Sequence, residues 1–287
     1  MIVDFHVHCF PDDLAKRAIP KLEEAAGMTA SFDGTLQGLK YSMREAGINF
    51  SVIQPIATKP SQTRTINDWS SAIQNNSIMN NSVKNNTTQE CILHDDTVKD
   101  EQIVAFGSIH PDYGDWKDEL KRIRDLGLRG IKYHPDYQSF FVDEERMLPV
   151  YDEIFNLGLI LLFHAGVDIG LTGPDHCTPR RLLSILKSCS GGKIIAAHMG
   201  GFRYWDDVLK YLLGEDIYFD TSYGIGWMSG MQAKSIISKH GYQKILFATD
   251  TPWSCQKEEV ERLKKLGLEE DVERAIFGGN ARRLLSI

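Results

Sequence analysis

The stretch IVDFHVH, residues 2–8, joins a strand-like apolar run to two histidines that stand one residue apart. Side chains at positions i and i+2 of a strand share a face, so we expect Asp4, His6 and His8 to point the same way. A His-x-His pair also arises by chance in many proteins. The rest of the chain therefore decides whether these imidazoles form a site.

Seven more strand-like runs follow, at residues 50–57, 103–110, 128–134, 159–166, 193–200, 217–222 and 245–250. Most are continuously apolar, which is typical of strands buried on both faces of a parallel sheet. Helical patterns lie between them, at 115–127, 144–158, 178–188 and 257–267. Eight β/α units in 287 residues predict an α/β fold of the (β/α)8 TIM-barrel type. A doubly wound open sheet is the alternative, and it usually has fewer strands.

The composition excludes several classes of partner. The formal net charge of −7 provides no basic surface for nucleic acids or anionic membranes. No apolar run approaches the roughly 20 residues that span a bilayer, and no secretion signal is recognisable. Five scattered cysteines without a CxxC pair are expected to be reduced thiols. We expect a cytoplasmic protein with a small-molecule substrate and no nucleic-acid or membrane partner, and a homodimer stays open.

Residues 74–100 do not fit the β/α pattern. The near-repeat QNNSI-MNNSV-KNNTT has a period of five, which matches neither a helix nor a strand. We expect 74–100 to be a mobile insertion between the second helix and the third strand, helical at most at its start, in a single domain spanning 1–287. Such helix-to-strand connections lie on the face of a TIM barrel opposite the active site.

Most of the histidines fall where the predicted strands end. These are His6, His8, His110, His134, His164 and His198, and Asp250 ends the eighth strand. The carboxyl ends of barrel strands converge on one mouth, where TIM-barrel active sites sit. Several imidazoles and a carboxylate in one mouth would be costly without partners, and a divalent cation removes that cost. Imidazole with carboxylate suits zinc, and also manganese, iron or cobalt.

These motifs resemble the amidohydrolase superfamily of metal-dependent hydrolases, which has HxH on the first strand, His on the fifth and sixth, and Asp on the eighth. More narrowly, the chain is similar to the amidohydrolase-related branch, which also contains aminocarboxymuconate-semialdehyde decarboxylase and related aromatic-acid decarboxylases. The resemblance covers the chain except about 74–100. It is carried by DFHVHCFPD (4–12), GIKYHP (130–135), HAG (164–166), AAHMGG (196–201), FATDTPW (247–253) and GNARRLL (279–285).

The resemblance implies roles for particular residues. One divalent metal ion, zinc in the first place, would be bound by four residues: His6, His8, His164 and Asp250. Asp250 would also act as the base for a metal-activated water, and His198 would be the acid/base or polarising group. A carboxylated Lys132 could bridge a second metal, although the branch usually has one. GIKYHP lacks the Glu that is typical of TatD-like nucleases, which counts against that function.

Candidate substrate contacts surround this predicted centre. Lys132 and His134 favour an anionic substrate, and Arg203, after Gly200-Gly201, could grip a carboxylate with two hydrogen bonds. The remaining candidates are His176 in the loop after the fifth strand, and Tyr223 and Trp253 as apolar walls. A capping, surface or packing role is an equal alternative for each of them.

Three functions are open on this basis. The first is metal-dependent hydrolysis of a small, anionic carbonyl compound, namely an amide, lactone or ester. The second is non-oxidative decarboxylation of a carboxylic acid at the same metal. The third is a non-catalytic metal-binding barrel that interacts through 74–100. We expect hydrolysis, because GIKYHP is closer to the hydrolase-like members than to the decarboxylases.

Overall fold

The structure, a computed structural model, describes residues 1–86 and 101–287, with the backbone alone for 78–86. The strands are β1 (Val3–Val7), β2 (Phe50–Ile53), β3 (Gln102–Ala105), β4 (Gly130–Tyr133), β5 (Ile160–Phe163), β6 (Lys193–Ala196), β7 (Tyr218–Asp220) and β8 (Ile245–Leu246). The α-helices are α1 (Asp12–Ala26), α2 (Leu36–Ala46), α3 (Thr63–Asn86), α4 (Trp116–Asp125), α5 (Pro135–Gln138), α6 (Leu148–Asn156), α7 (Pro179–Ser188), α8 (Trp205–Tyr211), α9 (Gly230–His240), α10 (Gln256–Lys265), α11 (Glu270–Arg274) and α12 (Asn280–Leu285). Single turns of other helix types are η1 (Pro60–Gln62), η2 (Glu145–Met147), η3 (Ile225–Trp227), η4 (Tyr242–Lys244) and η5 (Ala275–Gly279).

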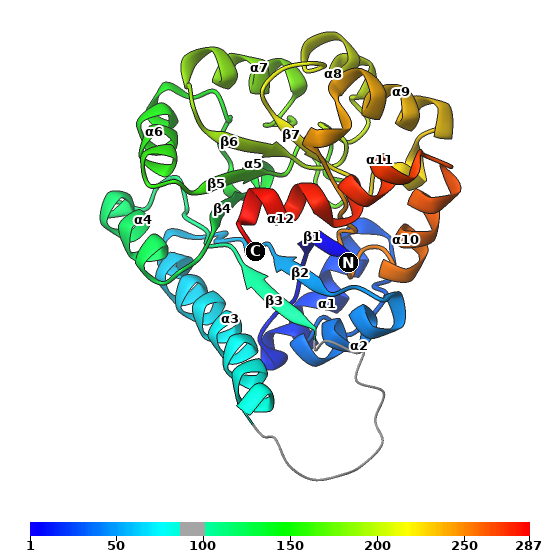
Figure 1. Cartoon of the computed structure of the whole chain (residues 1–287). Coiled ribbons are helices and arrows are strands. Elements are labelled where there is room, and N and C mark those ends of the chain that lie inside the picture. The colour runs from blue at the N-terminus through cyan, green and yellow to red at the C-terminus, as the bar shows by residue number, and fades with distance from the viewer. Residues whose placement is uncertain (87–100) are drawn as a thin grey trace, which may run out of the picture.

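The strands form one closed parallel barrel. They pair in the orders β1-β2-β3 and β4-β5-β6-β7-β8, and backbone hydrogen bonds join the two sets at both seams. The N–H of Gly107 donates to the carbonyl of Gly130 at 2.8 Å, and the N–H of Phe5 donates to the carbonyl of Phe247 at 2.9 Å. The helices surround the barrel (Figure 1), and the predicted (β/α)8 TIM-barrel fold is confirmed.

The predicted helices end where the sequence indicates. Gly127, Gly158 and Gly267 have φ angles of 77°, 70° and 60°, a left-handed conformation that glycine adopts without steric cost. Pro179 occupies the first turn of α7, directly after Thr178 at the N-cap. None of the helices in the described ranges combines the length and the apolarity that crossing a membrane requires.

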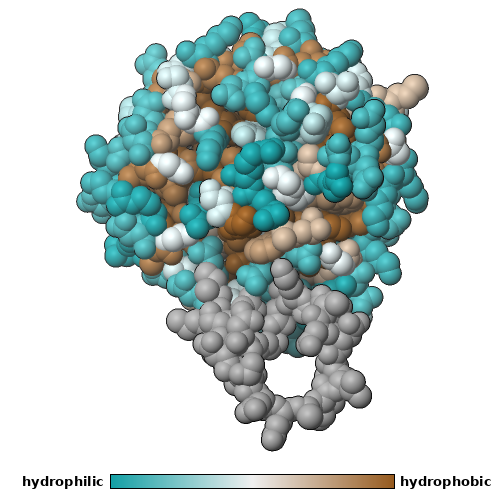
Figure 2. Space-filling view, in the orientation of Figure 1, coloured by the Kyte–Doolittle hydropathy of each residue, from teal (hydrophilic) through white to brown (hydrophobic). Residues whose placement is uncertain are grey.

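The interior of the barrel is apolar and is closed at one end. Helix α12 contacts β1 and β8 and crosses the barrel in the view of Figure 1. The outer surface seen from the same side is mainly hydrophilic (Figure 2). The buried interior residues are Val3, Phe5, Val52, Val104, Phe106, Ile160, Leu162, Ile195, Ala197, Leu246 and Ala248 of the barrel, with Ala281, Leu284 and Leu285 of α12. Helix α12 thus packs against this end of the interior, and the cavity described below opens at the carboxyl ends of the strands.

Strand β1 contains an irregularity that redirects its side chains. Its register with β2 shifts between Asp4 and Val7, and the side-chain amide of Gln54 satisfies the carbonyl of Phe5 at 2.9 Å. Asp4 therefore leaves the face that His6 occupies and accepts a hydrogen bond from Gln256 of α10 at 2.7 Å. The expectation that Asp4 and His6 share a face is wrong, because a bulge breaks the two-residue period.

The first part of the Asn-rich segment is a packed helix. Helix α3 continues to Asn86, so the period of five does not prevent helix formation. The side chain of Gln74 donates to the carbonyl of Gly127 at 3.1 Å and accepts from the N–H of Ala105 at 3.0 Å. Ser77 accepts from the N–H of Ile103 at 3.0 Å. Residues 87–100 lie outside the described residues, so the predicted insertion remains a prediction there.

Candidate metal centre

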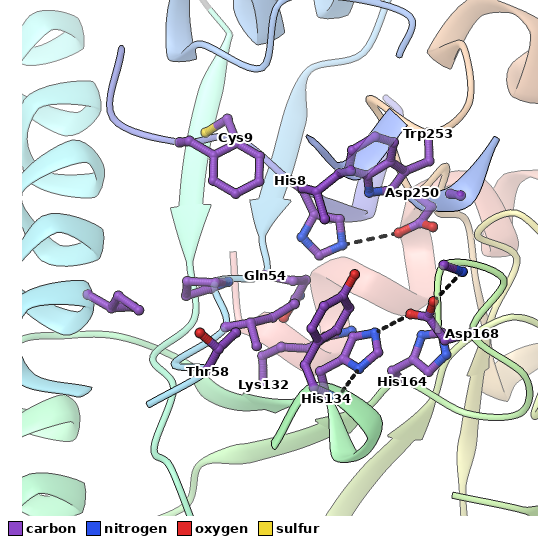
Figure 3. Close-up of a pocket in the computed structure, with 18 of the residues that line it drawn as sticks. His8, Cys9, Gln54, Thr58, Lys132, His134, His164, Asp168, Asp250 and Trp253 are labelled. Carbon is purple, nitrogen blue, oxygen red and sulfur yellow. Dashed lines mark hydrogen bonds and ion pairs between the residues drawn. The ribbon is translucent and has the colours of Figure 1, made fainter. Parts of the chain in front are cut away.

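A cavity of about 560 Å³ opens at the carboxyl ends of the strands. Six of its polar lining residues come from the ends of five strands, and the five of them that Figure 3 labels surround one space. These residues are His8, Lys132, His134, His164, His198 and Asp250. All six were singled out in the sequence, so the barrel brings most of the predicted site residues to one place.

Residues of the first and last strands form a ligand group at this mouth. The ligand atoms of His6, His8 and Asp250 all lie within 4.8 Å of one another. Asp250 Oδ1 is 3.1 Å from His8 Nε2 and 3.5 Å from His6 Nε2. Burial raises the pKa of the Asp250 carboxyl, but the hydrogen bond from His8 and the nearby imidazoles outweigh it and lower the pKa below 3.8. Asp250 is therefore an ionised carboxylate at neutral pH.

His6 is held in the tautomer that a metal ligand needs. Its Nδ1 donates to Asp220 Oδ2 at 2.9 Å, so the lone pair is on Nε2, which faces Asp250. Burial and the nearby Lys132 ammonium hold the pKa of His6 well below 6.5. The imidazole is therefore neutral, as metal binding requires.

A chain of hydrogen bonds also holds His164 in the tautomer that a metal ligand needs. His198 Nδ1 donates to the carbonyl of Ser222 at 2.8 Å, so His198 Nε2 is the acceptor for His164 Nδ1 at 3.0 Å. His164 Nε2 then carries a lone pair, and this buried atom has no hydrogen-bond partner among the described residues. An unpartnered buried acceptor costs about 1–3 kcal/mol, and a cation would remove this cost.

A second ligand group fits a cation less well. It consists of His134, His164 and Asp168. The Nδ1 of His134 accepts from the N–H of Tyr137 at 3.4 Å, so the proton is on Nε2, which pairs with Asp168 Oδ2 at 3.1 Å. Both nitrogens of His134 are therefore engaged, whereas of the two nitrogens of His8 in the first group only Nε2 is paired among the described residues, with the Asp250 carboxylate. His164 is outside the first group, and its role as the fourth ligand stays a prediction.

The donor atoms fit a divalent cation. The imidazoles of His6 and His8 and the ionised carboxylate of Asp250 converge, and the free Nε2 of His164 lies in the same cavity. Zinc, manganese, iron and cobalt all accept nitrogen and oxygen ligands of this kind. The arrangement supports a single metal centre held by the barrel mouth.

Lys132 forms the floor of the cavity. Its side chain is fully buried, and Nζ donates to His6 Nε2 at 3.0 Å. Burial lowers the pKa of Lys132 to about 8, while the nearby Asp250 and Asp220 carboxylates favour the ammonium form. Carboxylation of Lys132 to bridge a second metal stays a prediction.

Asp220 and Ser222 belong to the site but were not predicted. Besides orienting His6, Asp220 accepts from the N–H of His198 at 3.0 Å and from the Ser222 hydroxyl. Asp220 ends the seventh strand as Asp250 follows the eighth, so the strand-end criterion would have found it. His198 and Asp250 have φ angles of 60° and 67°, which are unusual for residues other than glycine and are typical of functional sites.

The predicted substrate contacts divide into two sets. Tyr223 and Trp253 line the cavity, as Lys132 and His134 do. His176 is not among the lining residues and pairs with Asp136 at 2.8 Å. Arg203 is exposed, is not among the lining residues, and lies over the rings of Phe202, which lines the cavity, and Trp227. The structure thus gives His176 and Arg203 no contact with the cavity.

Solved structures of similar fold include three informative examples. A TIM-barrel protein from Bordetella bronchiseptica is 18% identical with a TM-score of 0.71, covering 99% of this chain and 98% of its own. A 5-carboxyvanillate decarboxylase from Sphingomonas paucimobilis is 15% identical with a TM-score of 0.65, covering 100% and 99%. A dihydroxybenzoic acid decarboxylase from a Polaromonas species, solved with manganese and 2-nitroresorcinol, is 15% identical with a TM-score of 0.68, covering 99% and 96%. At these identities the likeness shows the fold.

Sequence comparisons give the family. No curated protein sequence matches the chain significantly. The family model described as Amidohydrolase matches residues 3–287, which is nearly the whole chain and contains every candidate ligand named above. The chain therefore belongs to the amidohydrolase family.

Proposed function

We propose that this protein is a metal-dependent, non-oxidative decarboxylase of a small carboxylic acid that has an apolar body. The observation that carries the proposal is the buried Lys132 ammonium beside the metal-ligand group, at one end of a cavity with largely apolar walls. A substrate carboxylate would pair with Lys132 at the charged end of the cavity, and an apolar substrate body would pack against the apolar walls. The decarboxylases among the similar structures, one with bound manganese, support this function over the hydrolysis that the sequence favoured.

The residues at the mouth have separate tasks. A divalent cation, zinc or manganese, held by His6, His8, His164 and Asp250 would supply Lewis acidity to the substrate's oxygen atoms. Lys132 pairs with the substrate's negative charge through its ammonium group.

The reaction itself is a replacement of the carboxylate by a proton. The bond between the carboxylate and its carbon breaks, carbon dioxide leaves, and the electron pair stays on that carbon until it takes a proton. The ammonium of Lys132 carries a proton at the cavity floor and can deliver it. Tyr223 and Trp253 line the cavity, and their rings packed against a bound substrate would displace water and favour protonation by the protein.

The test separates the three functions. Protein loaded with zinc or manganese is incubated with aromatic carboxylates, lactones, esters and amides, and carbon dioxide and hydrolysis products are measured together. We expect one carbon dioxide per molecule of decarboxylated product, lost on chelation and in Lys132→Met. Hydrolysis without carbon dioxide would establish the hydrolase instead. Stoichiometric metal with no turnover of any compound would favour a non-catalytic barrel.

A further inference from the structure

The cavity has a second end whose chemistry the metal centre does not explain. Its apolar residues are Leu14, Leu22, Met28, Ile56, Ile66 and Trp69. They come from α1, the loop after α1, the loop before α3, and α3, whereas the histidine, lysine and aspartate residues of the lining lie at the ends of β1, β4, β5, β6 and β8 or in the loop after β5. In Figure 3, Thr58 lies on the α3 side of Lys132 and His134, and Asp250 lies on the other side.

This second end carries no charge along its described lining. Between residues 9 and 69 the other polar lining groups are amides and hydroxyls, namely Gln54, Thr58, Ser61, Gln62 and Thr65. The end of helix α1 also lies close to the loop after β5. A Cβ placed on Gly170 of that loop would be 3.6 Å from the methyl group of Ala26. The second end is therefore an apolar chamber bounded by secondary structure.

The volume exceeds what a one-ring acid fills. A cavity of about 560 Å³ is in the range of roughly 300–1,000 Å³ that holds drug-sized ligands. A single-ring carboxylate bound at Lys132 would leave the side chains of α1 and α3 in contact with water. Removing that apolar surface from water favours a longer ligand.

We propose that the substrate carries, besides its carboxylate, an apolar group longer than one benzene ring, which binds between α1 and α3. The inference rests on the proposed function, because the carboxylate at Lys132 sets the direction of the substrate. Leu22 and Ile66 are specificity-determining residues in this arrangement, since they line the cavity from α1 and α3.

Binding of unreactive probes tests the inference without turnover. Benzoate and biphenyl-4-carboxylate are titrated calorimetrically into the metal-loaded full chain, with biphenyl-4-methanol as the uncharged analogue. We expect the two-ring acid to bind about ten- to a hundredfold more tightly than benzoate, because it buries a second ring. The uncharged analogue should bind more weakly than the two-ring acid.

Two variants of α1 give a matched comparison. Leu22→Asp places a charge in the chamber, and Ala25→Asp places the same charge on the exposed face of the same helix. Leu22→Asp should lose most of the advantage of the two-ring acid and leave benzoate binding unchanged, whereas Ala25→Asp should change neither. Ile66→Ala, which removes only methyl groups, replaces Leu22→Asp if that variant does not fold.

The outcomes separate this inference from the proposed function. If benzoate binds as tightly as the two-ring acid in the wild-type protein, the chamber does not select substrate length and the inference fails, while the decarboxylase proposal stands. If neither carboxylate binds the metal-loaded protein, both proposals fail.

Discussion

The Oδ2 atom of Asp4 accepts a 2.6 Å hydrogen bond from the hydroxyl of Thr249, and this bond ties the first strand to the residue beside Asp250. Asp4 Oδ1 also accepts from the backbone N–H of Thr249 at 3.0 Å. Asp4 thus closes the seam between β1 and β8 from outside the barrel. His6 lies two residues after Asp4, and Asp250 directly follows Thr249. The distance between these two candidate ligands therefore depends on the contact between Asp4 and Thr249.

Replacing Asp4 with Asn should weaken the metal site. The amide nitrogen of Asn cannot accept the hydrogen bonds that Asp4 receives from Thr249 and Gln256, so the seam loosens. We expect a ten- to hundredfold loss of metal affinity, the size seen for groups that orient metal ligands. Competition with a chromophoric chelator measures it, and Asp118→Asn on the surface of α4 is the control. Unchanged affinity in Asp4→Asn would show that the seam does not position the ligands.

Removing His164 should abolish metal retention, whereas removing His110 should not. Both histidines follow predicted strands, but His164 lines the cavity with a free Nε2, and His110 is absent from the lining and accepts from the N–H of Asp112 at 3.1 Å. Elemental analysis of His164→Ala and His110→Ala after dialysis makes the comparison. Near-stoichiometric metal in His164→Ala would refute the ligand assignment.

The metal-free protein should lose stability as the pH falls below about 6.5. Burial holds the pKa values of His6, His134 and His164 well below 6.5 in the folded state. The unfolded chain then binds more protons than the folded one, so the free energy of unfolding rises with pH and is lost on acidification. Each histidine contributes about 1.4 kcal/mol per pH unit at most. Urea titrations between about pH 5 and 7.5 measure the slope, and His134→Asn should reduce it. A flat profile would contradict the buried neutral state.

Gln74→Ala should destabilise the protein by about 2–3 kcal/mol, because two backbone groups of Ala105 and Gly127 lose their buried partner. Asn75→Ala, in the same Asn-rich repeat, removes an exposed side chain and should change the free energy of unfolding by less than about 0.5 kcal/mol. Urea denaturation measures both. Equal effects would mean that the packing of α3 on β3 contributes no more than an exposed position.

The strand ends of this barrel could be read from the sequence because a parallel sheet has a simple rule. Buried apolar runs mark the strands, and the residue that follows each run lies at one mouth. Lys132 and His134 obey the two-residue period, and both line the cavity. The ligand group of the first and last strands follows from the same rule, since these strands are neighbours in a closed barrel.

Other features depend on backbone geometry that a side-chain pattern does not record. The bulge in β1 turns Asp4 outward, and the left-handed backbone of His198 brings it into the cavity although Ala197 already faces the interior. The apolar chamber was also missed, because a helical pattern does not reveal which face of α1 or α3 borders a cavity. The motif GIKYHP alone favours hydrolysis, because a strand motif carries no information on the shape of the cavity.

His8 and Asp250 are separated by 242 positions, and yet they share one hydrogen bond at the mouth. During synthesis the amino-terminal imidazoles are made long before the carboxylate that completes their ligand group. The group formed by His6, His8 and Asp250 therefore assembles only when the final strand has joined the barrel, and the two ends of the chain are tied together at the mouth.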